Sequence, residues 1–269
     1  VNFRKIMAEV GKKTKLGILL LGGSFNPIHT QHIKLMIHVK QYLQQKYGFI
    51  IIAGYLVLSD DKYVKGKLKT EAISFKMRYD MCQLCCKDYE WLYPSHIEMA
   101  NPVIYGNKIT DINSNEYEFF KYDKSVSGII SKNEMKHIYK FDINGADKCF
   151  KNGVFRPLWK NIDKTNIYNI CLVVGRKGYS KTVKKEMNND VDNIPNNFIF
   201  MDSDDILDGT SSTKIRKHIH YIQNKLRNND DSKDNNDNND IINNHDAYND
   251  FRIKCKNMLH KDVIEYIIK

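Results

Sequence analysis

Apolar and polar positions along the chain fall into blocks that predict alternating strands and helices. The first apolar block, Leu16–Leu21, ends in two glycines, as expected of a buried parallel strand that enters a tight loop. The next block, Thr30 to about Tyr47, carries apolar residues at helical spacing. Further strands are predicted over Phe49–Leu58, Ile138–Ile143, Asn169–Val174 and Asn197–Met201, and further helices over Glu71–Lys87, Ser212–Leu226 and Asp262–Ile268. This order predicts a doubly wound α/β fold with a parallel sheet and C-terminal helices.

Two stretches do not fit this alternation. Residues 100–136 are polar and aromatic without a clear period, which predicts an irregular insertion. Residues 228–249 are mostly Asn and Asp, and such a tract buries too little apolar surface to offset the chain entropy, so we expect it to be disordered. With these two exceptions, residues 1–269 are expected to form a single domain.

The composition narrows the class of protein. The net charge is +10, which favours anionic partners without choosing among nucleotides, nucleic acid and acidic membranes. No apolar run near the N-terminus approaches the ~20 residues needed to span a bilayer. We therefore expect an intracellular protein, cytoplasmic or nuclear, without a membrane partner. The six cysteines are spaced neither as zinc ligands nor as a disulfide framework.

The loop after the first strand carries the strongest candidate chemistry. Its glycines, Gly22 and Gly23, would let backbone N–H groups approach a phosphate, and the helix that follows directs its positive dipole end at the same place. His29 and His32 are three residues apart, so both can face one side of the helix start and donate hydrogen bonds to phosphate oxygens. Further ligands that would make the two histidines a metal site are not evident, and we predict no metal-binding residues.

A second candidate phosphate site precedes the helix predicted over Ser212–Leu226. Hydroxyl groups and free N–H groups at a helix start bind phosphate, and an arginine one turn later supplies a planar cation. The same residue types also serve as ordinary helix caps. The residues concerned are Ser211, Ser212, Thr213 and Arg216.

Taken whole, the two strings resemble the motifs of one superfamily. Gly22 to His32 resembles the G-x-F-[ND]-P-x-H-x-x-H motif of adenylyl- and cytidylyltransferases, with Gln31 where many members have Gly. Thr210 to Arg216 resembles their I-S-S-T-x-I-R motif, with Thr210 in place of Ile. The resemblance implies a Rossmann-like nucleotidyltransferase domain in which His29, His32 and Arg216 are catalytic. It also implies ATP and phosphate binding by Gly22, Gly23, Ser24, Phe25, Ser211, Ser212, Thr213 and Arg216.

Further segments resemble the nicotinate/nicotinamide mononucleotide adenylyltransferases in particular. They are the Ser59–Lys65 loop, Arg78 on the next helix, the Gly145-Ala146-Asp147 and Leu158-Trp159 strings, and the strand end at Arg176. The resemblance implies that Lys65 contacts the mononucleotide phosphate, that Asp147 accepts hydrogen bonds from ribose, and that the indole of Trp159 stacks on the pyridine ring. Lys65, Gly145, Asp147, Leu158, Trp159 and Arg176 are thus the implied mononucleotide- and dinucleotide-binding residues.

One position departs from that family. Eukaryotic relatives place a second stacking aromatic before the residue that aligns with Glu98, and this chain has Ile97 there. Trp91, or an aromatic residue of the 100–136 segment, is the available substitute. The choice between nicotinate and nicotinamide therefore stays open.

The resemblance implies an enzyme of NAD biosynthesis. It would transfer AMP from ATP, with Mg²⁺, to nicotinate or nicotinamide mononucleotide, giving deamido-NAD or NAD and pyrophosphate. Two alternatives remain: another transferase of the superfamily, acting on pantetheine phosphate or transferring cytidylyl groups, and an RNA-binding module. We expect no nucleic-acid partner, because no tRNA-binding extension or aromatic stacking platform is evident. The sequence does not fix the oligomeric state, and a homo-oligomer is compatible with it.

Overall fold

The computed structural model describes residues 15–99, 101–111, 113–117, 137–203, 210–231 and 237–268, without the side chains of 227–231 and 237–245. The strands are β1 (Lys15–Gly23), β2 (Phe49–Leu58), β3 (Leu92–Pro94), β4 (Tyr139–Gly145), β5 (Phe150–Lys151), β6 (Val154–Phe155), β7 (Asn169–Val174) and β8 (Phe198–Met201). The α-helices are α2 (Thr30–Tyr47), α3 (Asp61–Leu68), α4 (Phe75–Cys86), α5 (Pro102–Thr110), α8 (Ser180–Asn189), α9 (Ser212–Asp231), α10 (Asp237–Cys255) and α11 (Lys261–Ile268). Short 3-10 turns are η1 (Lys69–Glu71), η2 (Ala146–Cys149), η3 (Leu158–Asn161) and η4 (Val191–Asn193).

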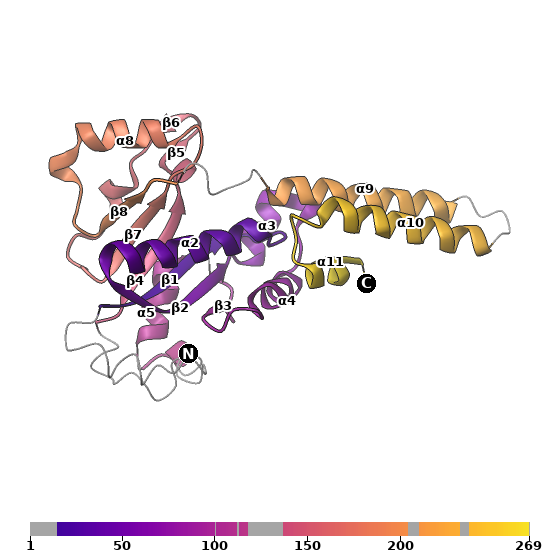
Figure 1. Cartoon of the computed structure of the whole chain (residues 1–269), viewed down its shortest axis with the longest axis horizontal. Coiled ribbons are helices and arrows are strands. Elements are labelled where there is room, and N and C mark those ends of the chain that lie inside the picture. Colours follow the sequence, from indigo (N-terminus) through magenta and orange to yellow (C-terminus); the bar gives the residue numbers. More distant parts are fainter. Residues whose placement is uncertain are drawn as a thin grey trace.

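The main sheet confirms the predicted fold class. Its order is β3-β2-β1-β4-β7-β8, and every neighbouring pair is parallel (Figure 1). The chain leaves β1 in one direction across the sheet and returns to β4 on the other side of it, so the order reverses between these two strands. Ligands of open α/β sheets bind at this reversal, beyond the carboxyl ends of the strands. The fold therefore places the Gly22-Gly23 end of β1 beside the Gly145 end of β4.

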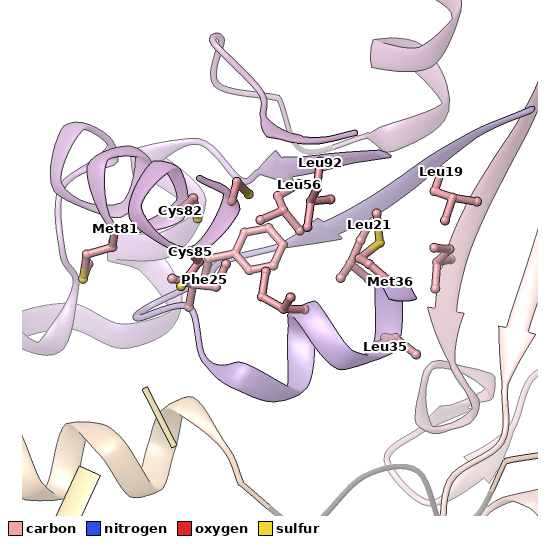
Figure 2. Packing of buried hydrophobic residues seen from close by; sticks show 14 of the residues in the cluster. Leu19, Leu21, Phe25, Leu35, Met36, Leu56, Met81, Cys82, Cys85 and Leu92 are labelled. Carbon is pink, nitrogen blue, oxygen red and sulfur yellow. The ribbon is translucent and has the colours of Figure 1, made fainter. Parts of the chain in front are cut away.

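Both faces of the sheet are covered. Helices α2 and α4 pack over one face, where the largest apolar cluster includes Met36 from α2 and Met81 from α4 (Figure 2). Helix α5 packs over the opposite face against β1 and β4, and α8 lies beside η2. Strand β1 is buried by both layers, which explains its continuous apolar sequence.

Helix α5 corrects the prediction of an irregular insertion over residues 100–136. Asn101 caps it by accepting hydrogen bonds from the N–H groups of Val103 and Ile104. Tyr105 and Ile109, four residues apart on one face, are each 1% exposed. One buried face of a nine-residue helix is too short to show a period against its polar surroundings. Residues 118–136 of the predicted insertion lie outside the described residues.

The prediction of disorder over residues 228–249 is also corrected where the structure describes that tract. Residues 228–231 continue α9 and residues 237–249 belong to α10, so only 232–236 lie outside the description. The two helices pack against each other and bury Ile222 of α9 with Ala247 and Phe251 of α10. Extending a helix from a packed end costs far less than starting one, so polar residues can continue it. Figure 1 shows the resulting hairpin projecting away from the sheet.

The remaining differences are local. The helix predicted over Glu71–Lys87 begins at Phe75, because Ser74 caps it, and Glu71 belongs to the separate turn η1. The Ser59–Lys65 loop contains the start of α3, which the pattern did not indicate. In the described part of the chain, no helix is both long and apolar enough to cross a membrane.

Candidate active site

The first half of the candidate site is the turn between β1 and α2. Phe25 takes the left-handed region, with φ 44°, which directs its ring into the core next to Cys82 and Cys85 of α4 (Figure 2). Non-glycine residues adopt this conformation only where their surroundings hold them there, as they often do at functional sites. The buried ring also contacts His32 edge-on, with centroids 5.0 Å apart. Phe25 thus ties the turn to the core.

His29 and His32 lie together at the start of α2, as predicted. Their rings stack with centroids 3.8 Å apart, and the backbone N–H of His29 donates to Nδ1 of His32 over 3.2 Å. Burial, with the nearby His29 as a smaller cause, holds the pKa of His32 well below 6.5. His32 is therefore neutral at pH 7, and because Nδ1 accepts a hydrogen bond, its proton resides on Nε2. His32 thus presents a hydrogen-bond donor without a fixed charge.

The second half of the site is the start of α9, which docks on the same turn. The hydroxyl of Ser212 donates to the carbonyl of Pro27 over 2.9 Å, and Nη1 of Arg216 donates to the carbonyl of Asn26 over 3.0 Å. The two sequence motifs, separated by some 190 residues, thus meet directly. The N-terminal ends of α2 and α9 converge there, and each directs the positive end of its dipole at this place.

Two hydroxyls of the second motif, those of Ser211 and Thr213, accept hydrogen bonds from groups of the same helix start. Ser211 Oγ accepts from the N–H of Lys214 over 3.3 Å, which is the ordinary capping role that the sequence left open. Thr213 Oγ1 accepts from Nη2 of Arg216 over 3.2 Å. These groups organise the helix start, and any contact with a ligand is additional to that role.

Arg78 joins the candidate site to a third loop. Its fully buried guanidinium donates to the carbonyls of Ser24, Ser59 and Ile73, at 2.9, 2.9 and 3.0 Å, and to the carboxylate of Asp61 at 3.0 Å. The turn after β1 and the loop after β2 are therefore held by one side chain. Lys65 is exposed on α3, one turn after Asp61.

The ends of β4 and β7 bring Asp147 and Arg176 together. The carboxylate and the guanidinium are 3.2 Å apart, and both side chains are accessible to solvent. A Cβ atom on Gly145 would lie 2.4 Å from the Asp147 carboxylate, so glycine leaves room for this carboxylate in its present position over the backbone. Asp147 follows β4, which is next to β1 in the sheet order, and Arg176 follows β7, one strand further away.

The structure buries Trp159, the residue to which the resemblance assigned a stacking role. It is 1% exposed and packs with Val173, Val183 and Phe198, while Nε1 donates to Asp190 over 2.8 Å. Leu158 is partly buried against the same cluster. The indole is a core residue here, because the β5–β6 hairpin and α8 close around it.

Trp91 does not take the place of the aromatic residue that relatives have at the position of Ile97. Its carbonyl pairs with Gly54 in the middle of β2, and the ammonium of Lys40 lies 4.2 Å from its ring centroid. Trp91 thus lies away from the carboxyl ends of the strands. Glu98 does reach the site region, where it accepts the N–H of Asp61 over 2.8 Å.

Sequence reasoning overlooked two residues of this region. Asn26, 1% exposed, links the β1 turn to η1: its Nδ2 donates to the carbonyl of Glu71 and its Oδ1 accepts from Ile73 N–H. Glu71 pairs with Arg216, Nε to Oε2 at 2.8 Å. Asn26 is part of the first motif, and this position could have marked it as a residue of the site. Nothing in the pattern around Glu71 pointed to Arg216.

The donors gathered here suit anions. Among the described residues, no three His, Cys, Asp or Glu side chains come close enough together to hold a metal ion. Two helix N-termini, the imidazole pair and Arg216 supply N–H groups and positive charge to one edge of the sheet. Such an arrangement can bind polyphosphate and neutralise charge that develops on it.

Comparison with known proteins agrees with this arrangement. Residues 20–218 match the family model described as cytidylyltransferase-like, well over half of the chain. The chain is 37% identical over 87 residues to nicotinamide/nicotinic acid mononucleotide adenylyltransferase 2 of Xenopus tropicalis, covering 32% of this chain and 26% of that protein. The rat protein of that name is 36% identical over 80 residues, 29% of this chain and 25% of the relative.

A plant relative gives the same picture. Nicotinamide/nicotinic acid mononucleotide adenylyltransferase of Oryza sativa subsp. japonica is 32% identical over 77 residues, or 29% of each chain. The match therefore spans only about a quarter of the length of these relatives. The assignment to a family rests on the longer match over residues 20–218, which includes both motifs of the site. From the sheet order, the two converging helix starts and the match over residues 20–218, the chain belongs to the cytidylyltransferase-like family.

Proposed function

We propose that this protein transfers AMP from ATP to nicotinate or nicotinamide mononucleotide, producing deamido-NAD or NAD and pyrophosphate. The observation that carries the proposal is the contact of Arg216 and Ser212 with the β1 turn, which joins two N–H-rich helix starts beside His29 and His32. The names of the relatives support the choice of acceptor.

The reaction needs little covalent chemistry from the protein. An oxygen of the mononucleotide phosphate forms a bond to the α-phosphorus of ATP, and the bond from that phosphorus to the bridging oxygen breaks as pyrophosphate leaves. Positioning and charge neutralisation supply most of the catalysis of such transfers. Ser24, the Phe25 backbone and Lys65 would hold the attacking phosphate, while His29, His32 and Arg216 would steady the phosphates that are transferred and released.

The ends of β4 and β7 would hold the nucleoside parts. Gly145 and Asp147 would fix the AMP part, and Arg176 would contact the dinucleotide once it exchanges Asp147 for a ligand. Mg²⁺ neutralises phosphate charge when bound. The residues present fit an ion that arrives on ATP, held by phosphate oxygens and water, since they offer donors instead of a carboxylate cage.

A turnover assay tests the proposal. Protein with ATP and Mg²⁺ is incubated with either mononucleotide, and dinucleotide and pyrophosphate are measured. Dinucleotide from either substrate supports the proposal, and the ratio of kcat/KM values gives the preference. Parallel reactions with pantetheine phosphate, and with CTP in place of ATP, identify a different transferase of the family if only they give pyrophosphate.

A variant tests the site. His32→Ala should lower kcat by about 100-fold or more, because it removes a donor to phosphate oxygens as charge develops on them. Circular dichroism should show the same fold. Turnover close to the wild-type value in folded His32→Ala would remove His32 from the mechanism.

A further inference from the structure

The guanidinium of Arg216 is held on all three of its nitrogens. Nε donates to Glu71 Oε2 over 2.8 Å, Nη1 to the Asn26 carbonyl over 3.0 Å, and Nη2 to Thr213 Oγ1 over 3.2 Å. Arginine has five N–H groups, so within the described residues two of them, one on each terminal nitrogen, lack a protein acceptor. The side chain is only 14% exposed. Its plane is therefore fixed before any ligand binds.

Glu71 is the one side chain of this set that comes from neither motif. It lies in η1, and its own carbonyl accepts from Nδ2 of Asn26 over 2.8 Å. The next turn of chain is held by the same amide, which accepts from the N–H of Ile73 over 2.7 Å. The carboxylate thus extends from a backbone that is already tied to the β1 turn. That anchoring lets Glu71 act as a fixed acceptor, although half of its side chain is in solvent.

We propose that Glu71 is a positioning residue, which orients Arg216 so that its two remaining N–H groups face the phosphates of the nucleotide. The inference rests on the proposed function for its effect on turnover. Among the described residues, the Glu71 carboxylate pairs with Arg216 alone, and two opposite effects follow. The hydrogen bond at Nε fixes the plane, which favours the transition state. The negative charge offsets part of the charge of Arg216, which weakens binding of ATP.

These two effects separate in a variant series. Glu71→Gln keeps an acceptor at Nε and loses the charge, so kcat should stay within about 2-fold of wild type while KM for ATP falls. Glu71→Ala loses both, and kcat should fall about 10-fold because the guanidinium keeps only two of its three hydrogen bonds and is oriented less precisely. Glu71→Asp keeps the charge but withdraws the acceptor from Nε by one methylene, so kcat should fall here too. This variant keeps the inference testable if Glu71→Ala folds poorly.

Glu265 offers a matched control. It pairs with Nε of Arg252 over the same 2.8 Å, and its side chain is 50% exposed, against 52% for Glu71. Glu265→Ala should leave kcat and KM unchanged. In an Arg216→Ala background, Glu71→Ala should cause no further loss, since the residue to be positioned is gone.

A spectroscopic measurement separates this inference from the proposed function. In wild type, the Nε–H signal of Arg216, assigned from its absence in Arg216→Lys, should exchange slowly with water, and Glu71→Ala should abolish that protection. The inference is overturned by unprotected Nε–H in wild type, by wild-type kcat in Glu71→Ala, or by an equal loss in Glu71→Gln and Glu71→Ala. Protected Nε–H in a protein without turnover on any substrate would overturn the proposed function and leave the positioning of Arg216 standing.

Discussion

At the scale of single residues, Arg78 holds three segments of the candidate site together through its buried guanidinium. A fully buried cation is tolerated only when its donors are satisfied, and here three carbonyls and a carboxylate satisfy them. We expect Arg78→Met to lower the free energy of unfolding by about 3 kcal/mol, because those acceptors would lose their partner in the interior. Urea unfolding measures the change.

The control for Arg78 is another arginine with a carboxylate partner. Arg252 pairs with Glu265 at the surface, and Arg252→Met should cost less than about 1 kcal/mol. Equal costs for the two substitutions would mean that burial of Arg78 has no special weight. Arg78→Met should also lose turnover, since Ser24 and Ser59 would no longer be held together.

His32 gives a second prediction at this scale. Its pKa is lowered in the folded protein, so the unfolded chain binds a proton at a pH where the folded protein does not. Stability from this residue is fully present above about pH 6.5, and it is lost as the pH falls below that value. Denaturation midpoints between pH 5 and 7 should show the decline, and His32→Gln should flatten it. A midpoint that rises toward pH 5 in wild type would contradict the lowered pKa.

The sequence predicted the residues that meet at the site better than the way they are held. His29, His32, Ser212 and Arg216 lie where two helix starts were expected. The role of Glu71 could not be predicted, because its contact with Arg216 spans 145 positions and no local pattern records it. Trp159 is the opposite case: the resemblance implied a ligand contact for it, and the sequence did not indicate that the neighbouring hairpin packs it into the core.

At the scale of elements, the longer strands of the main sheet were predicted well because burial on both faces makes them continuously apolar, whereas the short strands β3, β5 and β6 were not predicted. The short helix α11 was predicted, but α3, α5 and α8 were not. Helix α8 buries only Ser180 and Val183, and α3 only Val64, so neither shows a sustained apolar period. Helix boundaries moved where a capping side chain, such as Ser74, outweighed the hydrophobic pattern.

The junction of β7 and β8 yields a prediction at this scale. A Cβ atom on Gly175 would lie 3.0 Å from the backbone nitrogen of Ser203 and 3.2 Å from the carbonyl oxygen of Met201. Backbone cannot yield as a side chain does, so Gly175→Ala should destabilise the fold by about 1–3 kcal/mol. Thermal or chemical denaturation measures it.

Gly66 on α3 is the matched glycine. Nothing lies within 4 Å of a Cβ atom placed there, so Gly66→Ala should raise stability by up to about 1 kcal/mol through helix propensity. Opposite signs for the two alanine substitutions are the expected result. A neutral Gly175→Ala would show that β8 moves freely relative to β7.

At the scale of the whole molecule, the hairpin of α9 and α10 stands apart from the compact sheet layers (Figure 1). Among the hairpin side chains that the structure describes, Ile222, Ala247 and Phe251 are buried, and they lie toward the end that joins the body. Replacing residues 228–244 by a short glycine-rich turn should therefore shift Tm by less than about 2 °C and leave kcat unchanged. Calorimetry and the turnover assay measure both.

The base of the hairpin provides the contrast. Phe251 is 1% exposed, and Phe251→Ala should cost about 3–5 kcal/mol by leaving a cavity in the main cluster. If the shortened hairpin destabilised the protein as strongly as Phe251→Ala, the projecting ends would have a structural role that their position does not indicate.

The contact between the β1 turn and Arg216 also has a consequence for synthesis on the ribosome. The chain emerges from its N-terminus, so the turn and α2 are made early, while Arg216 follows some 190 residues later. Strands β1, β2 and β4 can pair before α9 exists, but the candidate site stays incomplete until most of the protein has been translated. A nascent chain halted after β8 would carry the sheet and the imidazole pair, and it would still lack Arg216.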